Sequence, residues 1–180
     1  MKTNFKPTPK TQVAELAATD RHHLNAAEGW LDLDLVDEAV EELRQVSVQA
    51  RFHPRVLRLH WRIASRNQHW GFAHAIAQGL VATCPDHPDG WLYRSQALHA
   101  MKRTAEAWQQ LLPAALRFPK NALICYHLAR YASVLHKFED ARRWLERATS
   151  LEEGNKLKWD AISEPDFDPL WKHLAYGQPA

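Results

Sequence analysis

Apolar residues follow one another along this chain with the spacing of an α-helix, and the helical pattern itself recurs at a longer period. Four alanines mark this period, because Ala39, Ala73, Ala107 and Ala141 each lie 34 residues from the next. Small or apolar residues also recur four and seven positions after each of these alanines. A fixed period of this length, with apolar residues in register, predicts an array of paired helices.

Within each period the pattern predicts two helices joined by a short turn. In the first repeat Leu24, Ala27 and Trp30 form an apolar stripe at helical spacing, and a second helix is expected from about Val36. Prolines favour breaks between later repeats, since they end or begin helices. We therefore expect four repeats, at residues 20–53, 54–87, 88–121 and 122–155.

Both ends of the chain depart from the period. Residues 1–19 contain Pro7 and Pro9 among lysines, which indicates a partly disordered N-terminal tail. Asp20 is expected to cap the first helix. After residue 155 we predict capping helices at 156–175, because the terminal repeat of a solenoid has to seal an exposed core edge, and a frayed tail at 176–180.

The repeat resembles that of the tetratricopeptide repeat (TPR) family over about residues 20–155. The third repeat carries the resemblance most clearly, through Trp91, Ser95, Leu98, Ala107, Leu111, Ala114 and Pro119. The resemblance implies an all-α fold, a right-handed α-solenoid of antiparallel helix pairs. Trp61 is a departure, since the family usually has Gly or Ala there, and Ala77 and Gly79 are expected to make room for it.

Composition and charge narrow the setting of the protein. With 46% hydrophobic and 24% charged residues the chain is globular in composition, and a net charge of +2 argues against a general nucleic-acid or membrane binder. The sequence shows no apolar stretch of membrane-spanning length and no secretory h-region, so we expect a cytoplasmic protein. Cys84 and Cys125 are expected to be buried or half-buried free thiols.

Signatures of catalysis and of metal binding are missing from the sequence. It has eleven histidines but no HExxH and no Cys/His quartet with zinc spacing. It also lacks a P-loop, a GxGxxG and a GxSxG motif. We therefore expect no enzymatic activity, no cofactor and no metal site.

Arginines supply the candidate site. Four of them fall within an arc of about 80° on the first helix of the second repeat, away from its apolar stripe. The resemblance implies that first helices line a concave groove, and superposing the repeats gives these candidate partner-binding residues: Arg55, Arg58, Arg62, Arg66, Tyr93, Gln96, Tyr126, His127 and Arg130. Arginine forks onto carboxylates, and tyrosine offers rigid apolar contact. The alternative is a solvated arginine face, or pairing with Glu28 or Asp32.

These residues favour a non-catalytic adaptor that binds an acidic or C-terminal peptide segment of a partner in its groove. The Lys and Asn clamp by which some TPR proteins hold a C-terminal carboxylate is replaced here by Leu24 and Glu28. A second hypothesis is an oligomerising scaffold or assembly module. A third is an RNA-binding helical repeat, against which the near-neutral charge counts.

Overall fold

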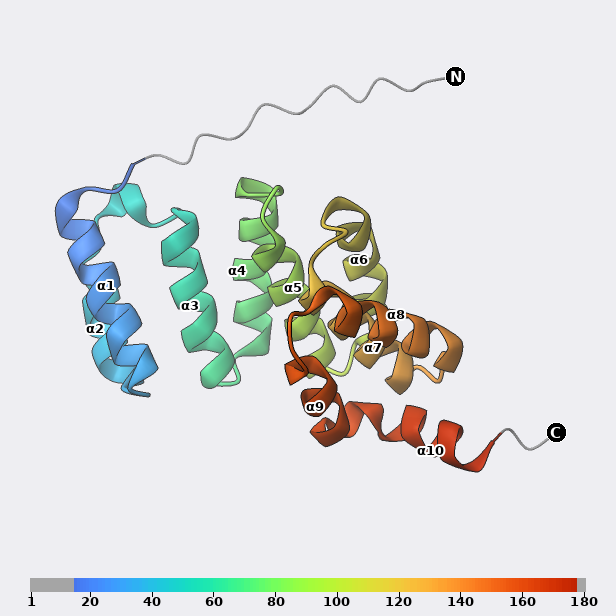
Figure 1. Cartoon of the computed structure of the whole chain (residues 1–180). Coiled ribbons are helices and arrows are strands. Elements are labelled where there is room, and N and C mark those ends of the chain that lie inside the picture. Colours follow the sequence, from blue (N-terminus) through green and yellow to red (C-terminus); the bar gives the residue numbers. More distant parts are fainter. Residues whose placement is uncertain (1–14, 178–180) are drawn as a thin grey trace, which may run out of the picture.

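Four helix pairs follow one another along the chain and form an all-α solenoid (Figure 1). The pairs are α1 (Ala18–Asp32) with α2 (Val36–Arg44), α3 (Pro54–Arg66) with α4 (Trp70–Thr83), α5 (Pro88–Ala100) with α6 (Thr104–Arg117), and α7 (Ala122–Val134) with α8 (Phe138–Leu151). A 3₁₀ turn, η1 (Val48–Ala50), separates the first two pairs. The computed structural model describes residues 15–177, so most of the predicted N-terminal tail and the last three residues lie outside it.

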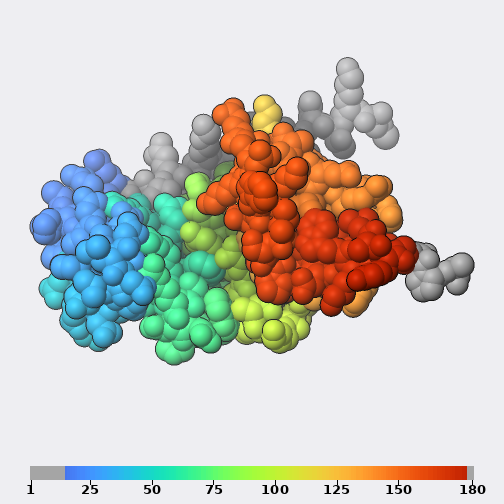
Figure 2. All heavy atoms as spheres, turned by 60° about the horizontal axis from the view of Figure 1, so that its bottom comes forward, coloured from blue at the N-terminus to red at the C-terminus, as the bar shows by residue number. Residues whose placement is uncertain are grey.

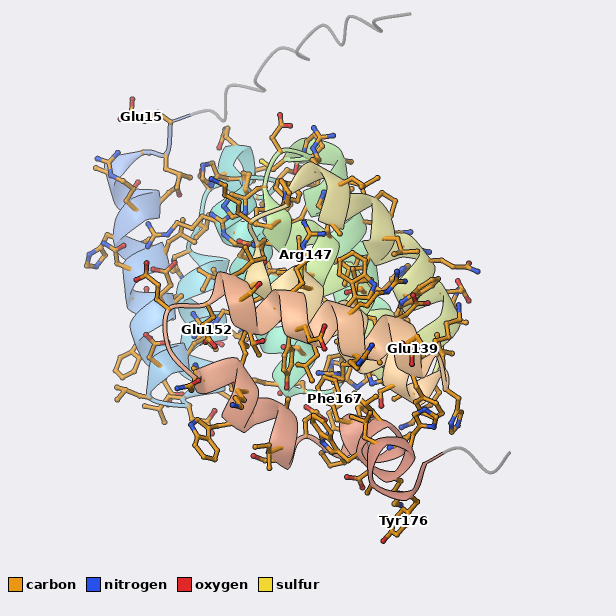
Figure 3. All side chains as sticks on the ribbon, turned by 45° about the vertical axis from the view of Figure 1, so that its right-hand side comes forward. Glu15, Glu139, Arg147, Glu152, Phe167 and Tyr176 are labelled. Atoms are coloured by element: carbon orange, nitrogen blue, oxygen red, sulfur yellow. The ribbon has the colours of Figure 1, made fainter. Side chains whose placement is uncertain are left out.

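The C-terminal cap consists of α9 (Lys156–Ser163), a second 3₁₀ turn η2 (Pro165–Phe167) and α10 (Asp168–Tyr176). Phe167 is fully buried at the junction of α9 and α10, where Figure 3 labels it. Leu170 of α10 is also buried, and its backbone N–H donates to the hydroxyl of Ser133 on α7 at 3.3 Å. The cap is therefore fastened mainly to α7 by the segment around η2.

The repeating alanines are the places where the two helices of a pair come closest. Ala39, Ala73, Ala107 and Ala141 are each the fourth residue of their helix, and all four are fully buried. Each belongs to a core cluster that includes residues of the first helix of its own pair. A methyl side chain at this position lets the backbones approach, so interiors packed to normal density leave little room for anything larger.

The turns inside the pairs share a backbone feature that also repeats every 34 residues. One residue in each turn has φ between 56° and 63°, in the left-handed region: Asp34, Gln68, Lys102 and His136. The N–H of the following residue donates to the carbonyl five positions earlier, at 2.8–2.9 Å. This is the Schellman motif that closes helix C-termini. Nothing in the residue pattern indicated it, because none of the four residues is glycine.

Asp20 does not cap the first helix, so that prediction was wrong. The helix begins at Ala18 with Ala17 at the cap position, and Asp20 lies buried inside its first turn. The carboxylate of Asp20 instead accepts hydrogen bonds from the backbone N–H and the hydroxyl of Ser47, both at 2.8 Å. These bonds tie the start of α1 to the chain just before η1, and they hold the pKa of Asp20 below its usual value.

Trp61 is accommodated at the helix crossing by small neighbours on two sides. Its indole lies in a core cluster with Ala73, Ala77 and Ala97, all fully buried. The role expected of Ala77 is thus seen. Gly79 lies elsewhere, since a side-chain carbon added to it would meet Leu57 at 4.0 Å and no other side chain within that distance.

Candidate partner-binding groove

A pocket of about 480 Å³ opens across the first helices α3, α5 and α7. Its lining consists of Trp61, Ser65, Arg66, Trp70, Gln96, His99, Ala100, His127 and Arg130. Four of the nine predicted site residues are therefore brought together here: Arg66, Gln96, His127 and Arg130. We call this pocket, with the surface of α7 beside it, the groove.

The arginines of α3 are not a bare cationic surface. Arg55 donates from Nε and from a terminal nitrogen to the two carboxylate oxygens of Glu28, at 2.9 and 2.5 Å. It also donates to the side chain of Asn25 at 2.6 Å. The hydrogen-bonded carboxylate raises the pKa of Arg55 above its ordinary value. Arg55 thus joins α3 to α1 and lies outside the pocket.

The other three arginines of α3 have acidic partners too. The ion pairs join Arg58 to Asp89 at 3.5 Å, Arg62 to Asp32 at 2.7 Å, and Arg66 to Asp34 at 3.0 Å. Pairing with Glu28 and Asp32, the alternative left open by the sequence, therefore occurs in the structure. A partner carboxylate at this face has to exchange with one of the chain's own.

His127 is buried on the floor of the pocket. The amide nitrogen of Gln96 donates to its Nε2 at 2.9 Å, so the ring proton is placed on Nδ1. Burial is the main cause that lowers the pKa of His127 to about 3, aided by the charge of Arg130, and the ring is therefore neutral near pH 7. Among residues 15–177, Nδ1 meets no hydrogen-bond acceptor.

Trp61 presents a second buried donor to the same pocket. Its Nε1 is shielded from solvent and meets no acceptor within the described part of the chain. A buried polar group without a partner costs about 1–3 kcal/mol, so such groups usually mark a place where something else supplies the bond. The pocket therefore contains two donors, Trp61 Nε1 and His127 Nδ1, and is suited to a ligand that carries acceptor oxygens.

The two predicted tyrosines have different surroundings. Tyr93 is half-buried and stacks on Trp61, with ring centroids 3.9 Å apart. Tyr126 is only 7% exposed, because the ring of Phe167 packs edge-on against it at 5.5 Å. Burial raises the pKa of both phenols, that of Tyr126 to about 12. Tyr93 thus supports the pocket wall through Trp61, whereas Tyr126 is covered by the cap.

The chain's own η2 turn reaches the C-terminal end of the pocket. The carboxylate of Asp166 lies 2.9 Å from Nε of Arg130 and accepts a hydrogen bond from Nε2 of His99 at 2.8 Å. The hydrogen bond from His99, together with the charges of His99 and Arg130, lowers the pKa of Asp166 despite its burial. Figure 2 shows the cap, in orange-red, standing forward at this end of the molecule and the first repeat, in blue, at the other.

His99 is a site residue that the sequence analysis missed. It lies one helical turn after Gln96 on α5, and it has Ser65 and Ser133 as its register mates 34 residues away on either side. Extending the superposed rows by one turn would have found it. Its Nδ1 is 3.0 Å from the hydroxyl of Thr104, which fixes the ring toward Asp166.

A second hollow of about 560 Å³ lies at the N-terminal edge, bordered by Leu16, Phe52 and Cys84. It contains none of the predicted site residues and adjoins the point where the described chain begins. Among residues 15–177 no group of three His, Cys, Asp or Glu side chains is placed to hold a metal ion. No helix in that range is both long and apolar enough to cross a membrane.

Solved structures show what this chain is similar to. The TPR protein TTC0263 of Thermus thermophilus superposes with a TM-score of 0.70 and 18% identity, over 88% of this chain and 83% of that one. MamA of Desulfovibrio magneticus RS-1 gives 0.66 and 16%, over 89% and 94%. Another MamA crystal structure gives 0.63 and 13%, over 90% and 97%.

These similarities show that the chain has a TPR-like repeat fold, as the 34-residue period predicted. No model of a known protein family matches the sequence, and no curated protein matches it either. At identities below one in five the likeness is one of fold, so the function has to be argued from the groove itself.

Proposed function

We propose that this chain is a non-catalytic protein-interaction module that holds an extended segment of a partner protein in the groove. The observation that carries the proposal is the pair of buried donors, Trp61 Nε1 and His127 Nδ1, in one pocket. Peptide carbonyls and carboxylates supply the acceptor oxygens that both donors lack. A volume of about 480 Å³ accommodates a few residues of such a segment.

The basic side chains at the rim favour a segment with acidic groups or a free C-terminus. Arg66 and Arg130 both line the pocket, and each is balanced at present by acids of this chain. A partner carboxylate would take the place of one of these acids. Such exchange adds little affinity, but it selects partners by charge and makes binding depend on salt.

The proposal is tested by selecting peptides from a random displayed library against the immobilised chain and measuring their affinity for variants. Trp61→Phe removes the Nε1 donor and keeps an aromatic ring, and we expect it to weaken a selected peptide about tenfold. Trp108→Phe is the matched control, because Trp108 also has a buried Nε1 without an acceptor among the described residues but does not line the pocket.

Two results would overturn the proposed function. One is a selection that yields no peptide above background. The other is a set of peptides whose affinity is the same for wild type and Trp61→Phe. A double change Arg58→Ala and Arg62→Ala is a further comparison, since these arginines lie beside the pocket and are expected to change the salt dependence of binding more than its strength at high salt.

A second candidate, the assembly scaffold, is favoured by the outer surface of the cap. Trp159 and Ile162 of α9 lie one turn apart and are 66% and 59% exposed. Tyr176 at the end of α10 points away from the body of the molecule in Figure 3 and is 86% exposed. Light scattering over a range of concentrations tests this candidate, and a mass equal to one chain at all concentrations would exclude it.

A further inference from the structure

The cap makes a contact that sealing the core does not require. Its η2 turn lies in the C-terminal part of the groove and presents Glu164, Asp166 and Phe167 to α5 and α7. We propose that this segment is an internal ligand of the groove, and that the partner segment which displaces it carries a carboxylate followed by an aromatic residue. The inference rests on the proposed function for the identity of the site, and it adds the chemistry of the partner.

The polar half of this contact gathers charged and polar groups from two helices onto one carboxylate. Asp166 is held by His99 of α5 at 2.8 Å and by Arg130 of α7 at 2.9 Å. Glu164 adds a longer ion pair with Arg130, at 3.7 Å. The guanidinium of Arg130 is mostly buried under this turn, so its attraction to Asp166 is screened by solvent less than that of an exposed pair.

The apolar half of the contact follows directly in sequence. Phe167 is fully buried, with its ring 5.5 Å from Tyr126 and 6.0 Å from Trp171. Tyr126 and Arg130 are one helical turn apart on α7, so they lie on the same face and receive two consecutive residues of the segment. One turn of α7 thus recognises an Asp–Phe pair, the acid through Arg130 and the ring through Tyr126.

The remainder of the cap is attached loosely enough to be displaced. Only Leu157 and Ala161 of the eight residues of α9 are buried. The link from α8 to α9 contains Gly154 with φ of 129°, a conformation that residues other than glycine rarely adopt. Rotation about this link would swing α9 and η2 away while the α7–α8 pair stays intact. A partner segment that supplies its own acid and aromatic ring would then take the place of the η2 turn on α7.

The test uses the whole chain and a fluorescent peptide that copies residues 161–170. In wild type the internal segment occupies the site, so the peptide binds weakly, since apparent affinity is reduced by the fraction of molecules that are open. Asp166→Asn weakens the internal contact and leaves His99, Arg130 and Tyr126 intact. We expect it to bind the peptide about tenfold more tightly than wild type. Adding Arg130→Gln to this variant should abolish the gain.

Asp168→Asn is the matched control, because Asp168 is exposed two residues further on and its substitution makes the same change of charge. It should bind the peptide as wild type does. Thermal unfolding of each variant, followed by circular dichroism, checks that the solenoid remains folded. As a second measurement, saturating peptide should speed hydrogen exchange of amides in residues 156–176 of wild type.

The inference is overturned if wild type, Asp166→Asn and Asp168→Asn bind the peptide equally, or if none of them binds it. It is also overturned if saturating peptide leaves exchange in the cap unchanged. These outcomes are separate from the library selection, which can fail while Asp166→Asn still captures the peptide, or succeed at Trp61 while it does not.

Discussion

The phenol ring of Tyr93 lies flat on the indole of Trp61, with the two planes inclined by 8°. The stack joins α3 to α5 at the position where the other three repeats have Ala27, Ser95 and Ala129. A large residue at a helix crossing is thus matched by an aromatic side chain from the next repeat. The same stack holds the indole that presents Nε1 to the groove.

The first prediction concerns the energy of this stack. In a double-mutant cycle with Trp61→Leu and Tyr93→Leu, we expect a coupling free energy of about 1 kcal/mol, because offset aromatic pairs contribute beyond the area that they bury. Urea unfolding of the four proteins gives the value. Strictly additive effects of the two substitutions would show that the rings are only neighbours.

The second prediction concerns the left-handed turn residues. Gln68→Gly should raise the free energy of unfolding by about 0.5–1 kcal/mol, since a residue with a Cβ is strained at positive φ. Gln78→Gly is the control of opposite sign, because Gln78 is an exposed residue inside α4, where glycine costs about 1 kcal/mol. A loss of stability in Gln68→Gly, measured by denaturant unfolding, would contradict the strain.

The third prediction concerns the alanines at the helix crossings. Ala107→Leu should lower the free energy of unfolding by about 3 kcal/mol, because the added atoms have no space between α5 and α6. Ala105→Leu, two residues earlier on the exposed side of α6, should change it by less than about 0.5 kcal/mol. Similar effects of the two substitutions would mean that the crossing tolerates a larger side chain.

The fourth prediction concerns pH. The pKa of His127 is lowered to about 3 in the folded protein, against an ordinary value of 6.5, so between these values the unfolded chain binds a proton that the folded chain does not. Stability must therefore fall as the pH falls through this range. Between pH 6 and 4 we expect wild type to lose about 1 kcal/mol per pH unit more than His127→Gln, which does not titrate.

The comparison with His127→Gln isolates this residue from other titrating groups. Burial also lowers the pKa of His60 and His74, and these residues act in both proteins alike. Asp166 has a lowered pKa too, but its contribution is lost only at more acid pH, below the ordinary range of a carboxyl. Parallel stability curves for the two proteins would show that His127 is protonated in the native state.

The repeat period was enough to predict the fold, because alanines at a fixed spacing report where two helices touch. It was also enough to place Gln96 and Arg130 in one row, since register positions superpose. It could not show that Arg55 and Arg62 would find acids on α1, because the reach of a long side chain is not periodic. The left-handed turns were missed for another reason, since Gln68 and Lys102 are not residues that signal positive φ.

The cap was the least predictable part of the site. Residues 164–167 lie beyond the last repeat and have no register mates, so nothing in the sequence indicated that Asp166 would meet His99, 67 residues earlier. The sequence pattern identified the turn as an interruption between helices. Its place in the groove depends on how α9 folds back from α8, which is a matter of tertiary packing.

The ion pairs of α3 give the two ends of the solenoid different sensitivity to their surroundings. Arg55, Arg62 and Arg66 all bridge from α3 to the first pair, close to solvent. Between α5 and α7 the corresponding link is a buried contact of the Ser95 and Tyr131 hydroxyls, which ions do not reach. Added salt screens the former and spares the latter. Ionic strength would thus act as a control on how firmly the first repeat is docked, and the solenoid would begin to come apart from its N-terminal end.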